Sequence, residues 1–255
     1  MKKIVSILFG ALLASMPLFA ASETVELPTG GKLHFYRAAV PNGVTVVDCP
    51  GGGYQILATG HEGHDMANRF TGQGINYAVL EYTLPKAPMD TLPMRDAHAA
   101  LRYVADNAAS LGADAGKIGI MGWSAGGHLA SHIANTDSLV AFQILGYPVI
   151  TMRTKTHGGT RRNLLGENPT EEQIRAFSND EIVHDGTPKA FIMLSADDST
   201  VPPLNSIKYF NALTAHKVPV EMHIFPTGGH GWGFRKNFVN HNEWTALLAA
   251  WLQKL

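Results

Sequence analysis

A serine flanked by glycines is the feature of this sequence best suited to chemistry. Residues 118–121 form a short apolar run typical of a buried strand, and apolar side chains recur at helical spacing from Leu129 onward. Between them lies Gly122-x-Ser124-x-Gly126, the pattern of a sharp turn that lifts a serine hydroxyl clear of a sheet. Larger side chains at the two glycines would clash with the neighbouring strand and helix. The unpaired N–H groups of the following helix favour negative charge near Ser124, so the turn suits nucleophilic attack by its hydroxyl.

An acid and a base follow later strand-like runs. Asp197 and Asp198 come after one apolar run, and His230 comes after the next. Because the carboxyl ends of strands in a mostly parallel sheet meet at one edge, these side chains are expected to converge with Ser124. Serine, aspartate and histidine in that order form one known version of a catalytic triad. Taken alone, the serine motif would also fit a glycine-rich turn without chemistry, and the residues leave both aspartates as candidates for the acid.

Three consecutive glycines follow another predicted strand. Residues 44–48 have the pattern of that strand, which leads into Pro50-Gly-Gly-Gly-Tyr54. Glycines in this position allow the backbone to approach a ligand closely and to direct N–H groups into a cleft. We therefore expect the N–H groups of Gly52, Gly53 and Ala125 to form an oxyanion hole beside the serine. A flexible loop is the alternative.

Strand and helix patterns alternate along the chain, which predicts an α/β fold with a mostly parallel central sheet and helices on both faces. The predicted strands span residues 32–37, 44–48, 76–82, 118–121, 139–145, 190–195 and 220–225, and the longer predicted helices span 93–110, 204–216 and 242–255. Residues 149–189 interrupt the alternation, with one short helix predicted at 170–177. We expect this segment to be an insertion near the cleft; a surface loop without a role is the alternative.

Composition limits the possible partners. The chain has 255 residues, of which 45% are apolar, so it can bury a sizeable core. The net charge is −1 and no basic run exceeds Arg161-Arg162, so no nucleic-acid partner is expected. Cys49 is the only cysteine, which excludes an internal disulfide. It ends an apolar strand, and we expect a buried structural thiol rather than a nucleophile.

The N-terminus has the pattern of a secretory signal peptide over residues 1–22. Lys2 and Lys3 precede an apolar run over residues 4–13, and Ala20-Ala21-Ser22 offers small residues for cleavage. A short membrane anchor is the alternative, but the run is too short to span a bilayer comfortably. Residues 23–255 are then expected to form one catalytic domain, exported to the periplasm or the extracellular space, with no membrane partner.

The sequence resembles the α/β-hydrolase superfamily. Within it, the chain is similar to the small carbohydrate esterases of the acetylxylan-esterase type, which are related to hormone-sensitive-lipase-like and prolyl-oligopeptidase-like hydrolases. The resemblance runs from about Leu27 to the C-terminus and is carried by Pro50-Gly-Gly-Gly-Tyr54, Glu62-Gly63, Gly122-Trp-Ser-Ala-Gly-Gly-His128, Asp197-Asp-Ser-Thr-Val-Pro202 and Gly228-Gly-His-Gly231. It implies an α/β-hydrolase fold with no large cap domain. One departure is Pro50, because related lipases carry a histidine before the three glycines.

The resemblance also implies roles for individual residues. Ser124 is the expected nucleophile and His230 the expected base, and the Asp-x-x-Val-Pro spacing of the family favours Asp198 over Asp197 as the acid. The residues expected to bind substrate are Tyr54, Glu62, Trp123 and Trp232. Core packing explains the two tryptophans nearly as well, and an acid at a helix N-terminus is an equal alternative for Glu62.

No metal or cofactor is expected. His128 and His132 lie four residues apart on a predicted helix, which is a spacing found in metal sites. A third ligand is missing, however, and the glutamate of the His-Glu-x-x-His motif is absent.

The resulting hypothesis is a secreted serine esterase that removes short acyl groups, acetyl above all, from a carbohydrate such as xylan through an acyl-enzyme. The carbohydrate part is implied by the resemblance alone. One alternative is a feruloyl or aryl carboxylesterase, or a small serine peptidase. Another is a non-catalytic carbohydrate-binding protein on this fold, since a fold does not fix a function. The oligomeric state is left open.

Overall fold

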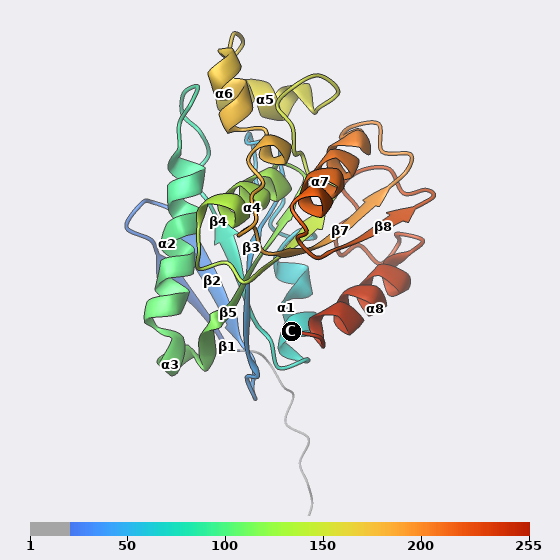
Figure 1. Cartoon of the computed structure of the whole chain (residues 1–255). Helices are drawn as coiled ribbons and strands as arrows, with labels where there is room; N and C mark the ends of the chain where they lie inside the picture. Colours follow the sequence, from blue (N-terminus) through green and yellow to red (C-terminus); the bar gives the residue numbers. More distant parts are fainter. Residues whose placement is uncertain (1–20) are drawn as a thin grey trace, which may run out of the picture.

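The computed structural model describes residues 21–255, so nearly all of the expected signal segment 1–22 lies outside the described residues. One eight-stranded sheet runs through the described part of the chain in the order β1-β2-β4-β3-β5-β6-β7-β8 (Figure 1). The strands are β1 Ala21–Glu26, β2 Lys32–Arg37, β3 Gly43–Cys49, β4 Asn76–Glu81, β5 Ala113–Trp123, β6 Phe142–Gly146, β7 Lys189–Ser195 and β8 Val220–Phe225. β1 pairs antiparallel with β2, and β2 pairs antiparallel with β4. The remaining neighbours in the sheet, from β4 through β3 to β8, are parallel.

Helices cover both faces of this sheet. The helices are α1 Ala67–Thr71, α2 Leu92–Asp106, α3 Ala108–Leu111, α4 Ala125–Thr136, α5 Gly158–Leu165, α6 Glu171–Ala176, α7 Leu204–Ala215 and α8 His241–Leu252, with short 3₁₀ turns η1 His64–Met66 and η2 Asn179–Glu181. α2, α4 and α7 lie on one face, and α1 and α8 lie on the other (Figure 1). The predicted architecture of a mostly parallel sheet between two helical layers is therefore confirmed.

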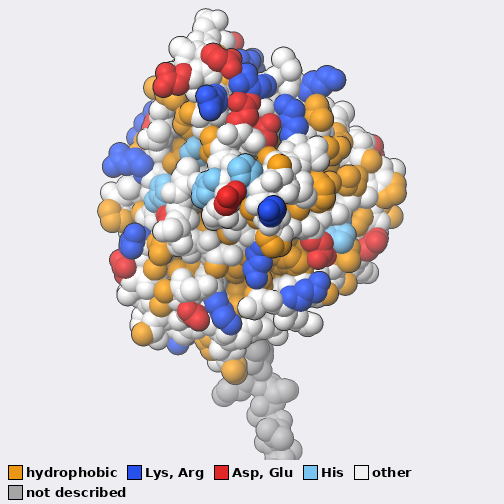
Figure 2. All heavy atoms as spheres, in the orientation of Figure 1, with side chains coloured by type: hydrophobic (Ala, Val, Ile, Leu, Met, Phe, Trp, Pro, Cys, Tyr) orange, Lys and Arg blue, Asp and Glu red, His pale blue; other side chains and the backbone are white. Residues whose placement is uncertain are grey.

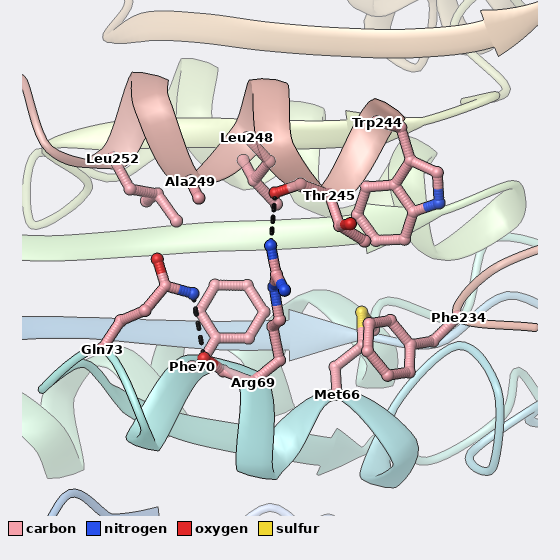
Figure 3. Close-up of a pocket in the computed structure, with 10 residues that line it drawn as sticks. All are labelled: Met66, Arg69, Phe70, Gln73, Phe234, Trp244, Thr245, Leu248, Ala249 and Leu252. Carbon is pink, nitrogen blue, oxygen red and sulfur yellow. Dashed lines mark hydrogen bonds between the residues drawn. The ribbon is translucent and has the colours of Figure 1, made fainter. Parts of the chain in front are cut away.

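The core lies in the two layers between sheet and helices. The central strands are buried along nearly their whole length, because helices cover both of their faces. A mostly apolar contact, here called the seam, lies between α1 and α8 (Figure 3). Arg69 on α1 donates to the carbonyl oxygen of Thr245 on α8 at 2.9 Å. The seam is a packing contact between two helices and lies apart from the residues predicted to do chemistry.

Five elements differ from the sequence prediction. The strand predicted over 139–145 is β6, which begins only at Phe142. The helix predicted over 93–110 is divided into α2 and α3 at Asn107, whose side chain donates to the carbonyl of Tyr103 and competes with the helical ladder. β5 starts at Ala113, ahead of its apolar run, because the polar lead-in still pairs with β3. β1 and α5 were not predicted. The helix expected at 170–177 is α6, begun by a capping box of Thr170 and Gln173.

The surface carries no block of one charge on the face that Figure 2 shows. Acidic and basic side chains are interspersed there, and charges of both signs gather at the tip formed by α5 and α6. No helix among residues 21–255 combines the length and apolar character that crossing a bilayer requires. Nothing on this face offers the single-sign field by which nucleic acids are bound.

Candidate active site

Ser124 occupies the turn between β5 and α4 in a strained backbone conformation. Its φ and ψ are 53° and −118°, a region that non-glycine residues rarely adopt. The turn is held because the Ser124 N–H donates to the carbonyl of Gly146 at 3.0 Å. A Cβ on Gly122 would clash with the carbonyl of Gly126, and one on Gly126 would clash with the carbonyl of Cys49. The two glycines therefore permit the turn that presents the Ser124 hydroxyl to the cleft.

The three residues predicted to form a triad lie within hydrogen-bonding reach of one another. His230, in the loop after β8, has Nε2 at 2.8 Å from the Ser124 Oγ. The other ring nitrogen, Nδ1, lies 2.7 Å from Oδ2 of Asp198, which follows β7. Because an ionised carboxylate can only accept, the Nδ1–H donates to Asp198, which leaves Nε2 to accept the serine proton. This arrangement can activate the hydroxyl as a nucleophile.

The two neighbouring aspartates have different partners. The Oδ1 of Asp198 accepts from the N–H groups of Thr200 and Val201, each at 2.9 Å, which fixes the carboxylate beneath the imidazole. Asp197 instead accepts from Gly228 and Gly229, at 3.3 and 2.8 Å. Asp198 thus contacts His230 itself, and Asp197 braces the loop that carries it.

Three backbone N–H groups near Ser124 have no hydrogen-bond acceptor among the described residues. Ala125 is the first residue of α4, so its N–H has no acceptor within the helix. The N–H groups of Gly52 and Gly53 donate to no group within residues 21–255, and both glycines line the cleft together with Ser124. Their φ angles of +133° and +67° favour glycine. The amides predicted to form an oxyanion hole are therefore free to bind negative charge at this place.

Glu62 braces the site rather than reaching into solvent. Its Oε2 accepts from the N–H of Gly51 at 3.0 Å, and its Oε1 accepts from the Tyr147 hydroxyl at 2.6 Å. The same hydroxyl accepts from the N–H of Gly233 at 2.9 Å, and the Tyr147 ring lies 4.7 Å from that of His230. Burial, and then the charge of Glu62, raise the pKa of Tyr147 well above its ordinary value, so the phenol stays protonated. Glu62 lines the cleft wall, but its polar atoms are committed to these two loops.

Three of the residues expected to bind substrate are buried in the core, which corrects that expectation. Trp123 is fully buried against the rings of Tyr147 and Trp232. Trp232 donates its Nε1–H to the Ser195 Oγ at 3.1 Å, and only 4% of the residue is exposed. Tyr54 is buried as well. Trp123 directly precedes Ser124 in the sequence, and its side chain points to the opposite side of the chain, into the packing beneath the site.

The cleft has a wall that the sequence did not identify. Its volume is about 400 Å³, within the range of small-molecule sites. Besides Thr200 and the other residues named above, it is lined by Gln55, Ile56, Ala58, His157, Gly159 and Asn163. Three of these belong to the inserted segment 149–189. No sequence signal marks them, because their position depends on how that segment folds over the sheet.

His157 and Asn163 have defined roles in that wall. The Nδ1 of His157 accepts from the N–H of Thr160 at 3.2 Å, so its proton is on Nε2. Burial and the proximity of His230 lower the pKa of His157, which is therefore neutral at pH 7 and can donate. Asn163 donates to the carbonyl of Gly53 at 2.8 Å and holds the glycine loop in place.

His128 and His132 are structural side chains. The Nε2 of His128 lies 2.8 Å from the carbonyl oxygen of Phe177, and its Nδ1 lies 2.9 Å from the hydroxyl of Tyr54. Burial lowers the pKa of His128 to about 3. His132 is bonded to Asn179 through Nδ1 at 3.1 Å. Both ring nitrogens of His128 are used by the protein, so this residue has no lone pair to offer a metal.

The sheet order, the strained serine turn and the chain order of the triad define an α/β-hydrolase fold. Residues 86–255 match the model of the prolyl oligopeptidase family, and the chain belongs to that family. The resemblance predicted from the motifs is thus confirmed at the level of fold and family.

Two similar proteins have names that refer to xylan. The chain is 38% identical over 199 residues to endo-1,4-beta-xylanase B of Butyrivibrio fibrisolvens, covering 71% of this chain and 31% of that protein. It is 33% identical over 259 residues to an acetylxylan esterase of Xylanibacter ruminicola, covering 96% and 54% respectively. The chain therefore spans about half, or less, of the length of these two relatives.

A solved structure with a similar fold is an acetyl ester-xyloside bifunctional hydrolase from Caldicellulosiruptor lactoaceticus. Its TM-score is 0.83 at 33% identity, and the match covers 89% of each chain. A sugar hydrolase from Lactococcus lactis has a TM-score of 0.81 at 28% identity, covering 92% of this chain and 98% of that one. Both match nearly the whole length of the present chain.

Proposed function

We propose that this chain is a secreted serine esterase that hydrolyses short-chain acyl esters, acetyl above all, on a carbohydrate such as xylan. The observation that carries the proposal is the position of His230. Its imidazole lies 2.8 Å from the Ser124 hydroxyl and 2.7 Å from Asp198, beside amides that have no acceptor in the described part of the chain. This is the geometry that acyl transfer through a serine requires.

Acylation follows from these contacts. The Ser124 Oγ attacks the ester carbonyl carbon while its proton moves to the Nε2 of His230. The carbonyl oxygen becomes an oxyanion and accepts hydrogen bonds from the backbone amides, each of which is worth roughly 10²–10³ in turnover. The tetrahedral species then breaks its bond to the sugar oxygen. That oxygen takes the proton from His230, and the acetyl group remains on Ser124.

Deacylation repeats the sequence with water. His230 takes a proton from a water molecule as the water oxygen attacks the acyl carbon, and general base catalysis of this kind contributes about 10²–10⁴-fold. The second tetrahedral species breaks the bond to the Ser124 oxygen, which recovers its proton from His230. Acetate leaves, and the free enzyme is restored.

The lining of the cleft favours a substrate that carries a small acyl group on a polar alcohol. The neutral His157 offers a donor to a sugar hydroxyl, and the exposed side chain of Ile56, 64% accessible, offers an apolar surface at the rim. The names of the relatives point the same way, since one is an acetylxylan esterase and another a xylanase. These observations support carbohydrate esters as the substrate class.

The test compares the parent chain with Ser124→Ala on p-nitrophenyl acetate and on acetylated xylan. We expect the variant to lose turnover by about 10⁴-fold or more, because the residues of a triad act as a unit. Ser110→Ala, an exposed serine on α3, is the matched control and should keep full activity. Labelling of the parent, but not of Ser124→Ala, by an organophosphonate would identify the nucleophile. Equal turnover in the parent and in Ser124→Ala would refute the proposal.

The family name gives a reason to test a peptidase as the second candidate. Aminoacyl anilides and feruloyl esters are therefore measured beside the acetyl esters. The proposal expects the highest kcat/KM on the acetyl esters. A higher kcat/KM on an aminoacyl anilide would assign a small serine peptidase, and a higher value on a feruloyl ester would assign an aryl carboxylesterase.

Export is part of the proposal and is supported by the charged start, apolar run and small residues of segment 1–22. Expression of the full chain in a bacterial host, followed by N-terminal sequencing of the periplasmic or secreted protein, tests it. We expect a new N-terminus close to Ser22. Retention of Met1 in a protein that stays in the cytoplasm would contradict export.

A further inference from the structure

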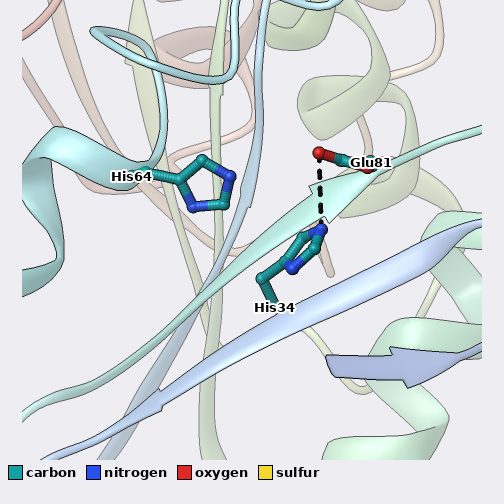
Figure 4. A group of neighbouring side chains, drawn as sticks. All are labelled: His34, His64 and Glu81. Carbon is teal, nitrogen blue, oxygen red and sulfur yellow. Dashed lines mark ion pairs between the residues drawn. The ribbon is translucent and has the colours of Figure 1, made fainter. Parts of the chain in front are cut away.

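A second cluster of ligand-type side chains lies apart from the cleft. His34 on β2, His64 in η1 and Glu81 at the end of β4 each place one ligand atom within 4.8 Å of the other two (Figure 4). All three residues are half-buried, and none of them lines the cleft or contacts the triad. The proposed ester hydrolysis makes no use of them.

The fold brings these residues together from distant parts of the sequence. β2 and β4 pair antiparallel, with His34 opposite Val79 and Lys32 opposite Glu81. His34 and Glu81 are therefore diagonal neighbours on one face of the sheet, because side chains two residues apart on a strand point to the same side. His64 arrives from the 3₁₀ turn η1 and faces both.

The hydrogen bonds of the two histidines leave one ring nitrogen of each available. The Nδ1 of His34 lies 3.0 Å from the Thr24 hydroxyl, and the Nδ1 of His64 lies 2.8 Å from the Tyr36 hydroxyl. The Nε2 of His34 is buried and has no hydrogen-bond partner among the described residues. It lies 3.4 Å from Oε1 of Glu81, without hydrogen-bond alignment. A buried ring nitrogen without a hydrogen-bond partner is costly unless it is paired with the carboxylate through a proton or a bound cation.

We propose that this cluster binds one divalent transition-metal ion of the Zn²⁺ type through His34 Nε2, His64 Nε2 and one oxygen of Glu81. Imidazole and carboxylate are ligands that Zn²⁺ accepts, and three protein ligands leave a position for water. Ligand atoms about 2.0–2.2 Å from a tetrahedral zinc are roughly 3.3 Å apart. The 3.4 Å separation of His34 and Glu81 fits such an edge. The ligand atom of His64 lies within 4.8 Å of the other two and would move closer when an ion binds.

The surroundings of the cluster match those of a metal site. Histidine ligands ordinarily donate their other ring N–H to an oxygen that fixes the tautomer and the ring orientation. Thr24 and Tyr36 supply such oxygens here. A bound ion would join three separate segments, β2, β4 and η1, at the antiparallel edge of the sheet. Because an ion that binds only the folded state stabilises it, the site would raise the thermal stability of the protein.

The test uses the full chain without a polyhistidine tag, freed of metal with EDTA. Zn²⁺ is titrated by calorimetry, and Co²⁺ is added separately because its visible absorption reports tetrahedral coordination. We expect one Zn²⁺ per chain, a tetrahedral Co²⁺ spectrum and a raised melting temperature. His34→Ala and Glu81→Gln should each weaken binding at least tenfold. Tyr36→Phe, which removes an orienting oxygen, should weaken it by about 10–100-fold.

His98→Ala is the matched control. His98 also lies beside a carboxylate, with Nδ1 at 2.7 Å from Oδ2 of Asp137, but no third ligand joins that pair among the described residues. The control should bind Zn²⁺ as the parent does. Circular dichroism and esterase turnover of the metal-free variants establish that they fold. Stoichiometric binding that persists in the His34→Ala, Glu81→Gln double variant, or no saturable binding by the parent at millimolar Zn²⁺, would overturn the site.

Discussion

At the scale of single residues, Glu62 connects two loops that must be in register for the triad to work. A buried carboxylate must be paired with donors, and Glu62 is paired with the Gly51 amide and the Tyr147 hydroxyl. Gly51 leads into the glycines of the expected oxyanion hole. Tyr147 packs against the ring of His230. One side chain thus sets the position of the amides relative to the base.

We predict that Glu62→Gln lowers kcat/KM by roughly tenfold to a hundredfold, because a hydrogen bond to a charged group is worth about 1.5–3 kcal/mol. The amide can offer an oxygen to Gly51 or to Tyr147, but not to both. Tyr147→Phe removes one of the same bonds and should have a similar effect. Steady-state kinetics on p-nitrophenyl acetate measures both variants.

The double variant decides whether the two residues act together. If they form one bracing unit, Glu62→Gln with Tyr147→Phe should lose much less than the product of the single losses. Fully multiplicative losses would mean that the two residues act independently. Unchanged kcat/KM in Glu62→Gln would show that the loops hold their register without the carboxylate.

Individual residues also show what the sequence could and could not predict. Ser124, His230 and the pair of aspartates were predictable because each follows a strand, and in a parallel sheet the end of a strand fixes a place in space. The choice of Asp198 over Asp197 came from the family resemblance. Trp123 was placed in the substrate site because it precedes Ser124, yet side-chain direction alternates at each step along the chain. Tyr147 could not be predicted from the sequence. An aromatic residue after a strand has the same spacing whether it supports a catalytic residue or packs in the core.

At the scale of elements, predictability followed burial. Strands covered on both faces are nearly continuous apolar runs, so β4 and β7 were predicted to within a residue at each end. β1 is an edge strand with alternating polar side chains, and it begins inside the segment that has the pattern of a signal peptide. α5 begins with two glycines and a threonine and also contains an asparagine, so its intrinsic helix preference is weak. Its packing over the cleft, rather than its own sequence pattern, makes it a helix.

His128 ties three elements together. It belongs to α4, it accepts from the Tyr54 hydroxyl in the glycine loop, and it donates to the Phe177 carbonyl at the end of the inserted helix α6. This network requires the neutral imidazole, because a charged ring could not accept from Tyr54. Burial, and then the charge of His132, keep the pKa of His128 at about 3 in the folded state.

The low pKa of His128 predicts an acid-dependent loss of stability. The unfolded chain binds a proton on this histidine below about pH 6.5, whereas the folded chain does so only near pH 3. Stability is therefore fully present above pH 6.5 and falls as the pH drops toward 3, by about 1.4 kcal/mol per pH unit from this group. Urea unfolding of the parent at pH 7.5, 6.0 and 5.0 measures the slope.

The variant His128→Gln should flatten that slope. Glutamine can accept from Tyr54 and donate to Phe177, yet it does not titrate. His98→Gln, which removes a partly exposed histidine from α2, should leave the steep slope in place. The same slope in His128→Gln as in the parent would show that other groups cause the acid sensitivity.

At the scale of the whole molecule, stability depends on the sheet without help from a disulfide. Cys49 is the only cysteine of the sequence, and it ends β3, whose two neighbours are β4 and β5. The thiol is fully buried. Burial, and then the charge of Asp48, raise its pKa well above the ordinary value, so the reactive thiolate does not form. Exposure of this thiol requires the centre of the sheet to separate.

We therefore predict that Cys49 reports global unfolding. In native buffer, the thiol reagent DTNB should label it only through rare complete opening, and the free energy of opening from labelling should equal that from urea unfolding, with the same dependence on urea. As the control, Val239→Cys in a Cys49→Ala background places a thiol at a residue that is 77% exposed, and it should react at once. Labelling of Cys49 that is insensitive to urea would instead show local opening at the end of β3. The glycine loop that follows this strand would then move independently of the sheet, and the oxyanion amides would not be held in advance of substrate binding.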